Sequence, residues 1–157
     1  MNKGSILKLN HTHPDVAKHL WIVFQQSYQV EADLIGAKEF PPLKRMVSDL
    51  QSSSTVFYGY MKNELLAGVV ELNHIKDQLE ICSLVVSPDF FRQGIASQLM
   101  DFALKTFNHE LCVVETAAAN VPAIKLYEKL GFIRSKCWIT PAQIEKLKLI
   151  RDLRVSP

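Results

Sequence analysis

Apolar and polar positions change period along the chain, and each period predicts one kind of element. Short runs rich in β-branched and aromatic residues, or with apolar residues at alternate positions, predict strands. These runs cover residues 5–9, 55–60, 65–72, 79–86, 111–116, 132–139 and 145–153. Apolar residues that recur every three or four positions predict helices. These segments cover residues 14–32, 41–51, 95–107 and 120–130, and the first of them fades over residues 28–32.

The predicted order of elements is β-α-α-β-β-β-α-β-α-β-β, which indicates one mixed α/β domain over residues 1–157. We expect a mostly antiparallel sheet flanked by helices, and 157 residues are enough to bury one such core. Thr12 and Asp15 have the spacing of a capping box at the start of the first helix, and Gly131 is placed to end the last one. Gly68, inside a predicted strand, indicates a bulge or the close approach of another element.

The stretch from Leu84 to Met100 passes from a strand through a tight turn into a helix. The first turn of a helix presents backbone N–H groups without partners, and its dipole end is positive. Gly94 and Ala96 are small, so an anion can approach these donors. The stretch lacks the Gly-Lys pair of a P-loop and the three glycines of a dinucleotide-binding fingerprint. It therefore predicts a phosphate-binding helix start of another kind.

Two short motifs indicate which kind. Residues 92–97, Arg-Gln-Gly-Ile-Ala-Ser, resemble the pyrophosphate loop of the GNAT superfamily of acyl-CoA N-acyltransferases. Residues 120–132 resemble the second signature of that family, N-x-x-A-x-x-L-Y-x-x-x-G-F. The motifs stand in the family's order, and the resemblance covers most of the chain. It implies the acyl-CoA N-acyltransferase fold, in which the strand before the loop splays from the next strand and the pantetheine arm of the donor lies in the gap.

The resemblance implies acetyl-CoA as co-substrate, no metal, and direct transfer of an acetyl group to a primary amine. The donor site would use backbone groups of the strand end, the loop and the helix start, with side chains of the second motif. These residues are Leu84, Val85, Val86, Arg92, Gln93, Gly94, Ile95, Ala96, Ser97, Asn120, Ala123 and Tyr127. Phe91 departs from the family pattern, which commonly has Arg or Gln there. Because most of the grip is made by the main chain, we expect donor binding to survive this change.

The predicted catalytic residues are Tyr127 and Glu80, and each has an alternative. Tyr127 matches the family tyrosine that often protonates the leaving thiolate, although its helical spacing also suits a buried core aromatic. Glu80, on the strand that leads to the loop, resembles a position where some members carry a catalytic glutamate. Glu71 is the rival base, and ordered water is a further alternative. Asn120 matches the asparagine that contacts the donor, and an asparagine there also suits a helix N-cap.

The acceptor is expected to be a small-molecule amine or a protein amine, and the sequence does not choose between them. Its site should come from the first two helices, their connection and the last two strands. The candidate residues are Tyr28, Glu31, Asp33, Phe40, Trp138 and the turn at Thr140. Acidic Glu31 and Asp33 suit a cationic amine. A homodimer is compatible with the resemblance. The alternative function is a non-catalytic acyl-CoA-binding sensor, which would keep the loop without needing a catalytic tyrosine.

The composition, with 48% hydrophobic and 22% charged residues, is that of an ordinary globular protein. The net charge is +2 and no long run of Lys or Arg occurs, so we expect no nucleic-acid or membrane-surface partner. No apolar stretch has the character of a signal peptide or the length of a membrane span, and we expect a cytoplasmic protein.

Two residue types invite a metal or redox hypothesis. His11, His13 and His19 lie close together, but the sequence supplies no further cluster to complete a set of metal ligands. The three cysteines, Cys82, Cys112 and Cys137, are each expected to be small buried hydrophobes in a reducing compartment.

Overall fold

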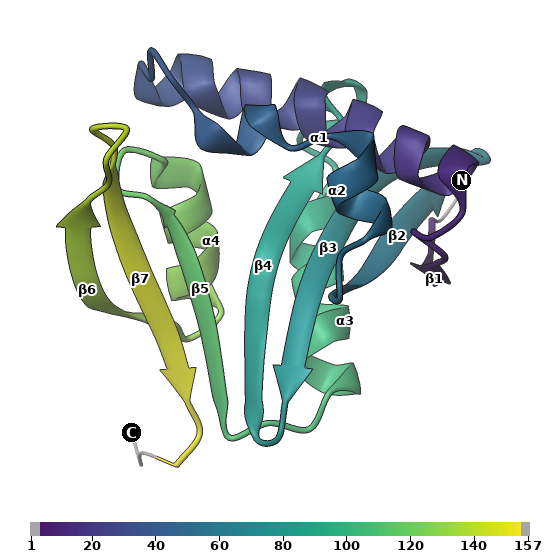
Figure 1. Ribbon diagram of the computed structural model, residues 1–157. Helices are drawn as coiled ribbons and strands as arrows, with labels where there is room; N and C mark the ends of the chain where they lie inside the picture. Colours follow the sequence, from purple (N-terminus) through teal and green to yellow (C-terminus); the bar gives the residue numbers. More distant parts are fainter. Residues whose placement is uncertain (1–3, 155–157) are drawn as a thin grey trace.

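The computed structural model describes residues 4–154, in which a central sheet carries helices on both faces (Figure 1). The strands are β1 (Ser5–Leu9), β2 (Val56–Lys62), β3 (Leu65–Ile75), β4 (Gln78–Val86), β5 (Leu111–Ala117), β6 (Ile133–Ile139) and β7 (Glu145–Asp152). The helices are α1 (Pro14–Ile35), α2 (Val47–Gln51), α3 (Ile95–Thr106) and α4 (Val121–Lys129), with short 3₁₀ helices at Pro41–Lys44 and Pro88–Phe90. The predicted element order and the mixed α/β class are confirmed.

The strands form one seven-stranded sheet in the order β1-β2-β3-β4-β5-β7-β6. Neighbouring strands are antiparallel except β4 and β5, which run parallel. This parallel pair extends only from Gln78 opposite Leu111 to Ile81 opposite Val114. Beyond that point the strands separate, and Figure 1 shows them as the arms of a V that opens toward α1. The mostly antiparallel sheet and the splayed strand are therefore both confirmed.

A β-bulge on β4 lies where the two strands part. Glu71 of β3 is opposite Ser83, whereas the next residue, Leu72, is opposite Ile81. Cys82 is therefore an extra residue on β4. Because a bulge bends its strand and increases the local twist, it contributes to the separation of β4 from β5.

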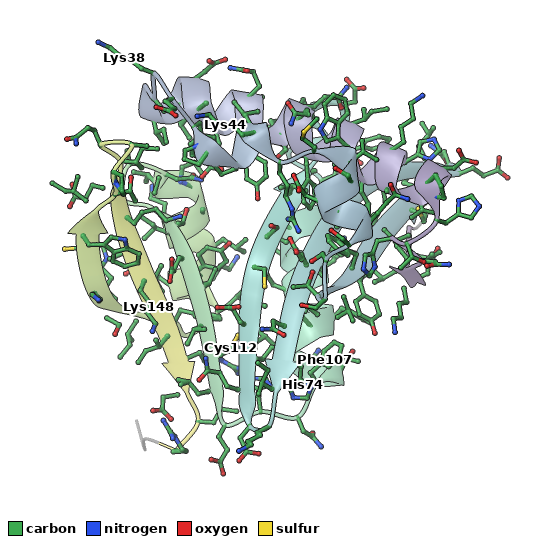
Figure 2. All side chains as sticks on the ribbon, in the orientation of Figure 1. Lys38, Lys44, His74, Phe107, Cys112 and Lys148 are labelled. Atoms are coloured by element: carbon green, nitrogen blue, oxygen red, sulfur yellow. The ribbon has the colours of Figure 1, made fainter. Side chains whose placement is uncertain are left out.

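The helices bury a separate apolar core on each face of the sheet. α3 and α4 cover one face, where the larger core includes Leu99, Tyr127 and Cys112, the last of which is labelled in Figure 2. α1 and α2 cover the other face over β2, β3 and β4, with a smaller core around Leu20 and Phe57. α1 continues across the open end of the V (Figure 1). Within the described part of the chain, no helix is both long enough and apolar enough to cross a membrane.

α3 lies very close to β3. A Cβ atom on Gly68 would stand 2.8 Å from Cγ2 of Ile95, so this glycine permits the approach and confirms the prediction made for it. At the other end of α3, the ring of Phe107 packs edge-on against His74 of β3, with 5.4 Å between the ring centroids (Figure 2). These contacts hold α3 against β3 near both ends of the helix.

α1 is longer than the apolar pattern predicts. We expected it to fade over residues 28–32, but it ends only before Gly36, whose φ of +67° suits a left-handed cap. It continues because its last turns still pack on the protein, and Ala32 is 4% exposed. The capping box at Thr12 is also wrong, because the N-cap is His13, whose ring accepts a backbone N–H from the first turn.

The predicted second helix, residues 41–51, is two short pieces. A 3₁₀ helix at Pro41–Lys44 is followed by α2, and Arg45 between them has extended dihedral angles. The guanidinium of Arg45 reaches β3 and binds the carboxylate of Glu71. This long-range ion pair prevails over the local helical preference.

Candidate active site

The start of α3 presents backbone N–H groups to a cleft beside β4. Arg92 has a φ of +62° and Gly94 one of +74°, so the loop passes twice through the left-handed region before the helix begins. Gly94 is the N-cap and has no side chain to satisfy the first turn, and Gln98 N bonds to Gly94 O at 3.1 Å. The N–H groups of residues 95–97 therefore have no partner within the helix. Such a helix start binds phosphate groups well.

The cleft measures about 460 Å³ and is called the donor cleft below. Its walls come from α1, the end of β4, the loop and α4. The predicted donor-site residues that line it are Leu84, Val86, Arg92, Gln93, Gly94, Ile95, Ala96, Ser97, Asn120, Ala123 and Tyr127. Val85 is not among them, because its side chain is 2% exposed and packs in the opposite core beneath α1. Phe91 also lines the cleft and is 41% exposed, so an apolar ring stands where the family commonly has Arg or Gln.

A smaller cavity of about 140 Å³, called the throat below, lies between the separated ends of β4 and β5. Residues from α1, the 3₁₀ helix, β4, β5 and β7 line it, among them Tyr28, Phe40 and Cys82. The residues shared by the throat and the donor cleft are Glu31, Leu84, Asn120, Ala123 and Tyr127. We call this shared set the junction. β4 is no longer paired with β5 there, so its backbone edge can bind an extended ligand like an added strand.

A hydrogen bond joins α1 to α4 at the junction. Nδ2 of Asn120 donates to Oε1 of Glu31 at 2.9 Å, while Oδ1 of Asn120 accepts from the backbone N–H of Ala123 at 3.3 Å. Asn120 is therefore the N-cap of α4, which confirms one of the two interpretations; its contact with the donor stays a prediction. Burial raises the pKa of Glu31, against the smaller lowering effects of Asn120 and Lys146.

Tyr127 belongs to both the core and the junction. Its ring is 5% exposed and packs against Phe132 with 5.8 Å between centroids. Burial, followed by the nearby Glu31 carboxylate, raises the pKa of Tyr127 well above its usual value. Burial likewise raises the pKa of Tyr28, across the throat, to about 12. Both phenols are therefore neutral at physiological pH and can donate a proton or a hydrogen bond.

Glu71, the rival base, is held in a buried ion pair. Its two carboxylate oxygens accept from Nη1 and Nη2 of Arg45 at 2.7 and 2.8 Å, from Thr55 at 2.7 Å and from Ser83 at 2.8 Å. Burial opposes the charged form, but these hydrogen bonds outweigh it and keep the pKa of Glu71 below its ordinary value. The carboxylate is thus occupied and a poor proton acceptor. Its role is to anchor Arg45, whose backbone oxygen accepts from the indole N–H of Trp21 at 3.0 Å.

Glu80 lies lower on β4, where the strand is paired with Asn73 on one side and Val113 on the other. It lines neither the donor cleft nor the throat, so the structure does not bring the predicted base to the junction. Its carboxylate stands 3.5 Å from the sulfur of Cys82.

The cysteines differ from one another in exposure. The expectation of a buried hydrophobe holds for Cys112 but is wrong for Cys82 and Cys137, which are exposed. The bulge turns Cys82 toward the throat, and Cys137 lies on the edge strand β6. Although Cys82 is exposed by its accessible surface, the protein around its sulfur partly desolvates the thiol, and this effect, followed by the charges of Glu71 and Glu80, raises the pKa of Cys82 to about 12.

The acceptor candidates divide between the inside and the outside of the throat. Tyr28, Glu31 and Phe40 line it, as expected. Asp33 does not, because it faces solvent on α1 and accepts from Gln29. Trp138 is also outside, where its ring contacts the ammonium of Lys136 at 5.6 Å.

Two charged residues of the throat, Glu115 and Lys146, were not predicted from the sequence. Glu115 is exposed on a strand whose other side chains are mostly buried, and a single acidic residue in that apolar run was an available signal. Lys146 pairs in register with Ala117 of β5, a relation that depends on the sheet order.

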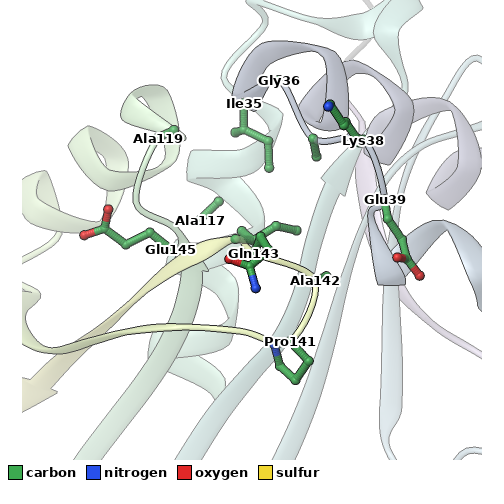
Figure 3. Close-up of a pocket in the computed structure, with 12 residues that line it drawn as sticks. Ile35, Gly36, Lys38, Glu39, Ala117, Ala119, Pro141, Ala142, Gln143 and Glu145 are labelled. Carbon is green, nitrogen blue, oxygen red and sulfur yellow. The ribbon is translucent and has the colours of Figure 1, made fainter.

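Two outer grooves lead toward the throat, with volumes of about 560 and 530 Å³. Figure 3 shows the first, between Ile35 and Lys38 at the end of α1 and Pro141 and Gln143 on the turn between β6 and β7. The second includes the predicted Thr140 and shares Phe40, Pro42 and Lys146 with the throat. The throat can therefore be approached from the side opposite the helix start.

The splayed strand pair, the open helix start and the N-capped helix with its buried tyrosine are the features of one class of fold, the acyl-CoA N-acyltransferases. The Acetyltransferase (GNAT) family model matches residues 14–132, and the chain belongs to this family.

Three curated proteins are similar to this chain in sequence. UPF0157 protein YqkA from Bacillus subtilis is 36% identical over 129 residues, which are 82% of this chain and 38% of that protein. Streptothricin acetyltransferase from Escherichia coli is 36% identical over 97 residues, 59% of this chain and 56% of that protein. N-alpha-acetyltransferase from Saccharolobus solfataricus is 31% identical over 83 residues, 50% of this chain and 46% of that protein. The chain thus spans between 38% and 56% of the length of these relatives.

Solved structures show the same fold. The ribosomal-protein-S18-alanine N-acetyltransferase from Escherichia coli superposes with a TM-score of 0.73 at 20% identity, covering 100% of this chain and 97% of that one. PaiA N-acetyltransferase from Thermoplasma acidophilum, in complex with coenzyme A, gives 0.70 at 18% identity, covering 93% and 98%.

Proposed function

We propose that this chain transfers an acetyl group from acetyl-CoA directly to a primary amine. The observation that carries the proposal is the junction, where a cleft with a phosphate-binding helix start meets a throat open to the opposite side. Donor and acceptor can enter from different sides and meet without either crossing the other's site. Holding two reactants in attack geometry is itself a large part of catalysis.

The fit of the cleft to the donor rests on backbone groups. The free N–H groups of residues 95–97 suit a pyrophosphate, and Arg92 beside them can add a charge-assisted hydrogen bond. The unpaired edge of β4 from Leu84 to Val86 suits the amides of a pantetheine arm, and one N–H of this edge would bind the thioester oxygen. Phe91 contributes no charge, so binding of the pyrophosphate depends mainly on main-chain groups.

Tyr127 is proposed as the acid that protonates the departing thiolate. Its hydroxyl lies at the junction and is kept neutral by burial and by the Glu31 carboxylate. A thiolate that forms there needs a proton, and a phenol that holds one can supply it. Tyr28 lines the throat but not the donor cleft, which favours Tyr127 for this role.

Direct transfer is favoured over an acetylated cysteine intermediate. Cys82 is the cysteine that lines the throat among the described residues, and its pKa is raised to about 12. A thiol in that state contains very little of the thiolate that attacks a thioester. The amine itself is therefore the proposed nucleophile.

Turnover with a panel of amines tests the proposal. The names of two relatives suggest streptothricin and an α-amine as acceptors to test, and alkyl amines should be tested beside them. Release of coenzyme A thiol that depends on the amine, with an acetylated product detected by mass spectrometry, is the expected result. Acetyl-CoA binding without turnover of any amine would instead favour the sensor function.

A further inference from the structure

The junction contains a single acidic residue among the described part of the chain. Glu31 is the one carboxylate lining the donor cleft, and the throat adds only Glu115 on the far strand β5. Glu31 belongs to α1, the helix that crosses the open end of the V (Figure 1). Glu31 lies in the last turns of α1, where the apolar sequence pattern fades but the helix continues to Ile35.

Glu31 is held in place yet keeps an oxygen for a ligand. Its Oε1 accepts from Asn120 at 2.9 Å, and within residues 4–154 no side chain donates to Oε2. Glu71 provides the contrast, because both of its oxygens are occupied by donors from Arg45, Thr55 and Ser83. A carboxylate fixed through one oxygen and open at the other is suited to bind an ammonium group.

Resting on the proposed function, we infer that Glu31 is the catalytic carboxylate that binds the acceptor as an ammonium ion and takes its first proton. The acceptor class is then a primary amine that is protonated at neutral pH, and Glu31 rather than Glu80 is the base. This assignment makes use of the cationic character that the sequence suggested for the acceptor.

Glu31 and Tyr127 each exchange one proton with the reactants. One N–H proton of the ammonium passes to Oε2 of Glu31, and the freed lone pair attacks the thioester carbon. The carbon–sulfur bond breaks, and the thiolate takes the hydroxyl proton of Tyr127. The tyrosinate then recovers a proton from the newly acylated nitrogen, while Glu31 releases its proton to solvent. The products are the amide, coenzyme A thiol and one proton.

The groups around Glu31 favour a base at this position. Tyr28 on α1 and Tyr127 on α4 face it as neutral phenols, Lys146 of β7 is the nearby cation, and Glu115 of β5 also lines the throat. Burial raises the pKa of Glu31, which increases its affinity for a proton, while Lys146 and Asn120 limit the rise. A carboxylate shifted in this direction is a better general base near neutral pH.

Glu31→Gln is the test variant, because glutamine can still accept from Asn120 and so preserves the link to α4. Asp33→Asn is the matched control, since it removes a negative charge from the same helix at an exposed position. Glu80→Gln tests the base that was predicted from the sequence. Each variant is measured for kcat/KM against pH with an amine that the wild type acetylates, and for thermal stabilisation by acetyl-CoA.

For Glu31→Gln we expect kcat/KM to fall about 100-fold at pH 7, the scale of general base catalysis. The loss should shrink as the pH approaches the pKa of the amine, about 7.7–8.0 for an N-terminus and about 10.4 for a lysine-like amine. Asp33→Asn and Glu80→Gln should match the wild type, and all variants should keep the acetyl-CoA shift.

A loss that is the same at every pH, no loss for Glu31→Gln, or a larger loss for Glu80→Gln would overturn the assignment. Failure of the proposed function has a different signature, because the wild type itself would then turn over no amine.

Discussion

The two halves of the proposed site are built in different ways. The donor half, made of the end of β4, the loop and the starts of α3 and α4, offers mainly backbone groups fixed by local geometry. The acceptor half, made of the end of α1, the 3₁₀ helix and the β6–β7 turn, is held by side chains that reach across the fold. The donor half should therefore tolerate side-chain changes better than the acceptor half. Changes that alter the backbone should affect the donor half more strongly.

The ion pair that anchors the acceptor half should show the largest effect. Glu71→Ala leaves Arg45, 27% exposed, without its partner, and should lower the free energy of unfolding by about 3 kcal/mol. Because the pKa of Glu71 is lower in the folded chain than its ordinary 4.5, the pair stabilises fully at neutral pH and loses its effect as the pH falls below that value. Denaturant unfolding should show that the free energies of unfolding of the wild type and Glu71→Ala differ less at pH 4 than at pH 7.

The control for this variant is Asp101→Asn, which breaks the exposed pair with Lys105 and should change stability by less than about 0.5 kcal/mol. Equal effects of the two variants would show that the buried pair does not anchor the acceptor half.

The tyrosine at the junction should affect chemistry without affecting donor affinity. Tyr127→Phe keeps the ring and removes the acid, so kcat should fall about 100-fold, equivalent to about 2.7 kcal/mol. The dissociation constant of acetyl-CoA should not change. Tyr58→Phe is the matched control. Tyr58 packs against Phe102 with 5.0 Å between the ring centroids, and it lines neither the donor cleft nor the throat. Full activity of Tyr127→Phe would show that Tyr127 is not the acid.

The role of Gly94 in donor binding can be distinguished from the backbone strain that any residue other than glycine has at a positive φ. Gly94 and Gly36 both have positive φ, and a Cβ on either meets no atom closer than 4.0 Å. Alanine at either position should therefore cost about 1–2 kcal/mol of stability from the backbone alone. Only Gly94→Ala should also weaken acetyl-CoA binding, measured by calorimetry. Equal binding by both variants would show that the loop does not hold the donor.

The cysteine of the bulge should have the smallest effect. Cys82→Ala removes a thiol whose raised pKa makes it a weak nucleophile, so kcat should stay at the wild-type value. Steady-state turnover checks this. A large loss, together with an acetyl group found on Cys82 of the wild type by mass spectrometry, would replace direct transfer with a covalent intermediate.

The same contrast explains what the sequence could predict. The loop, the start of α3 and the N-cap at Asn120 depend on residues close together in the chain, so short motifs located them correctly. Alternation along β4 turns the side chain of Val85 into the opposite core, so only its backbone can contact the donor, and that contact stays a prediction.

The acceptor half depends on strand register and tertiary contacts, which no local pattern contains. Glu115 and Lys146 enter the throat only because β5 lies between β4 and β7, and Cys82 only because of a bulge. Gly36 did mark the true end of α1, but the fading apolar pattern before it obscured the signal.

Acetyl-CoA bound at the start of α3 should stabilise the folded chain, and thermal unfolding with and without acetyl-CoA measures this effect. At 100 times the dissociation constant, the ligand should stabilise the fold by about 2.7 kcal/mol. For 157 residues this corresponds to a rise in Tm of about 5–10 °C. Coenzyme A should produce a similar shift, and ATP and NAD much smaller ones. No shift with acetyl-CoA, or equal shifts with ATP and NAD, would show that the start of α3 is not an acyl-CoA site.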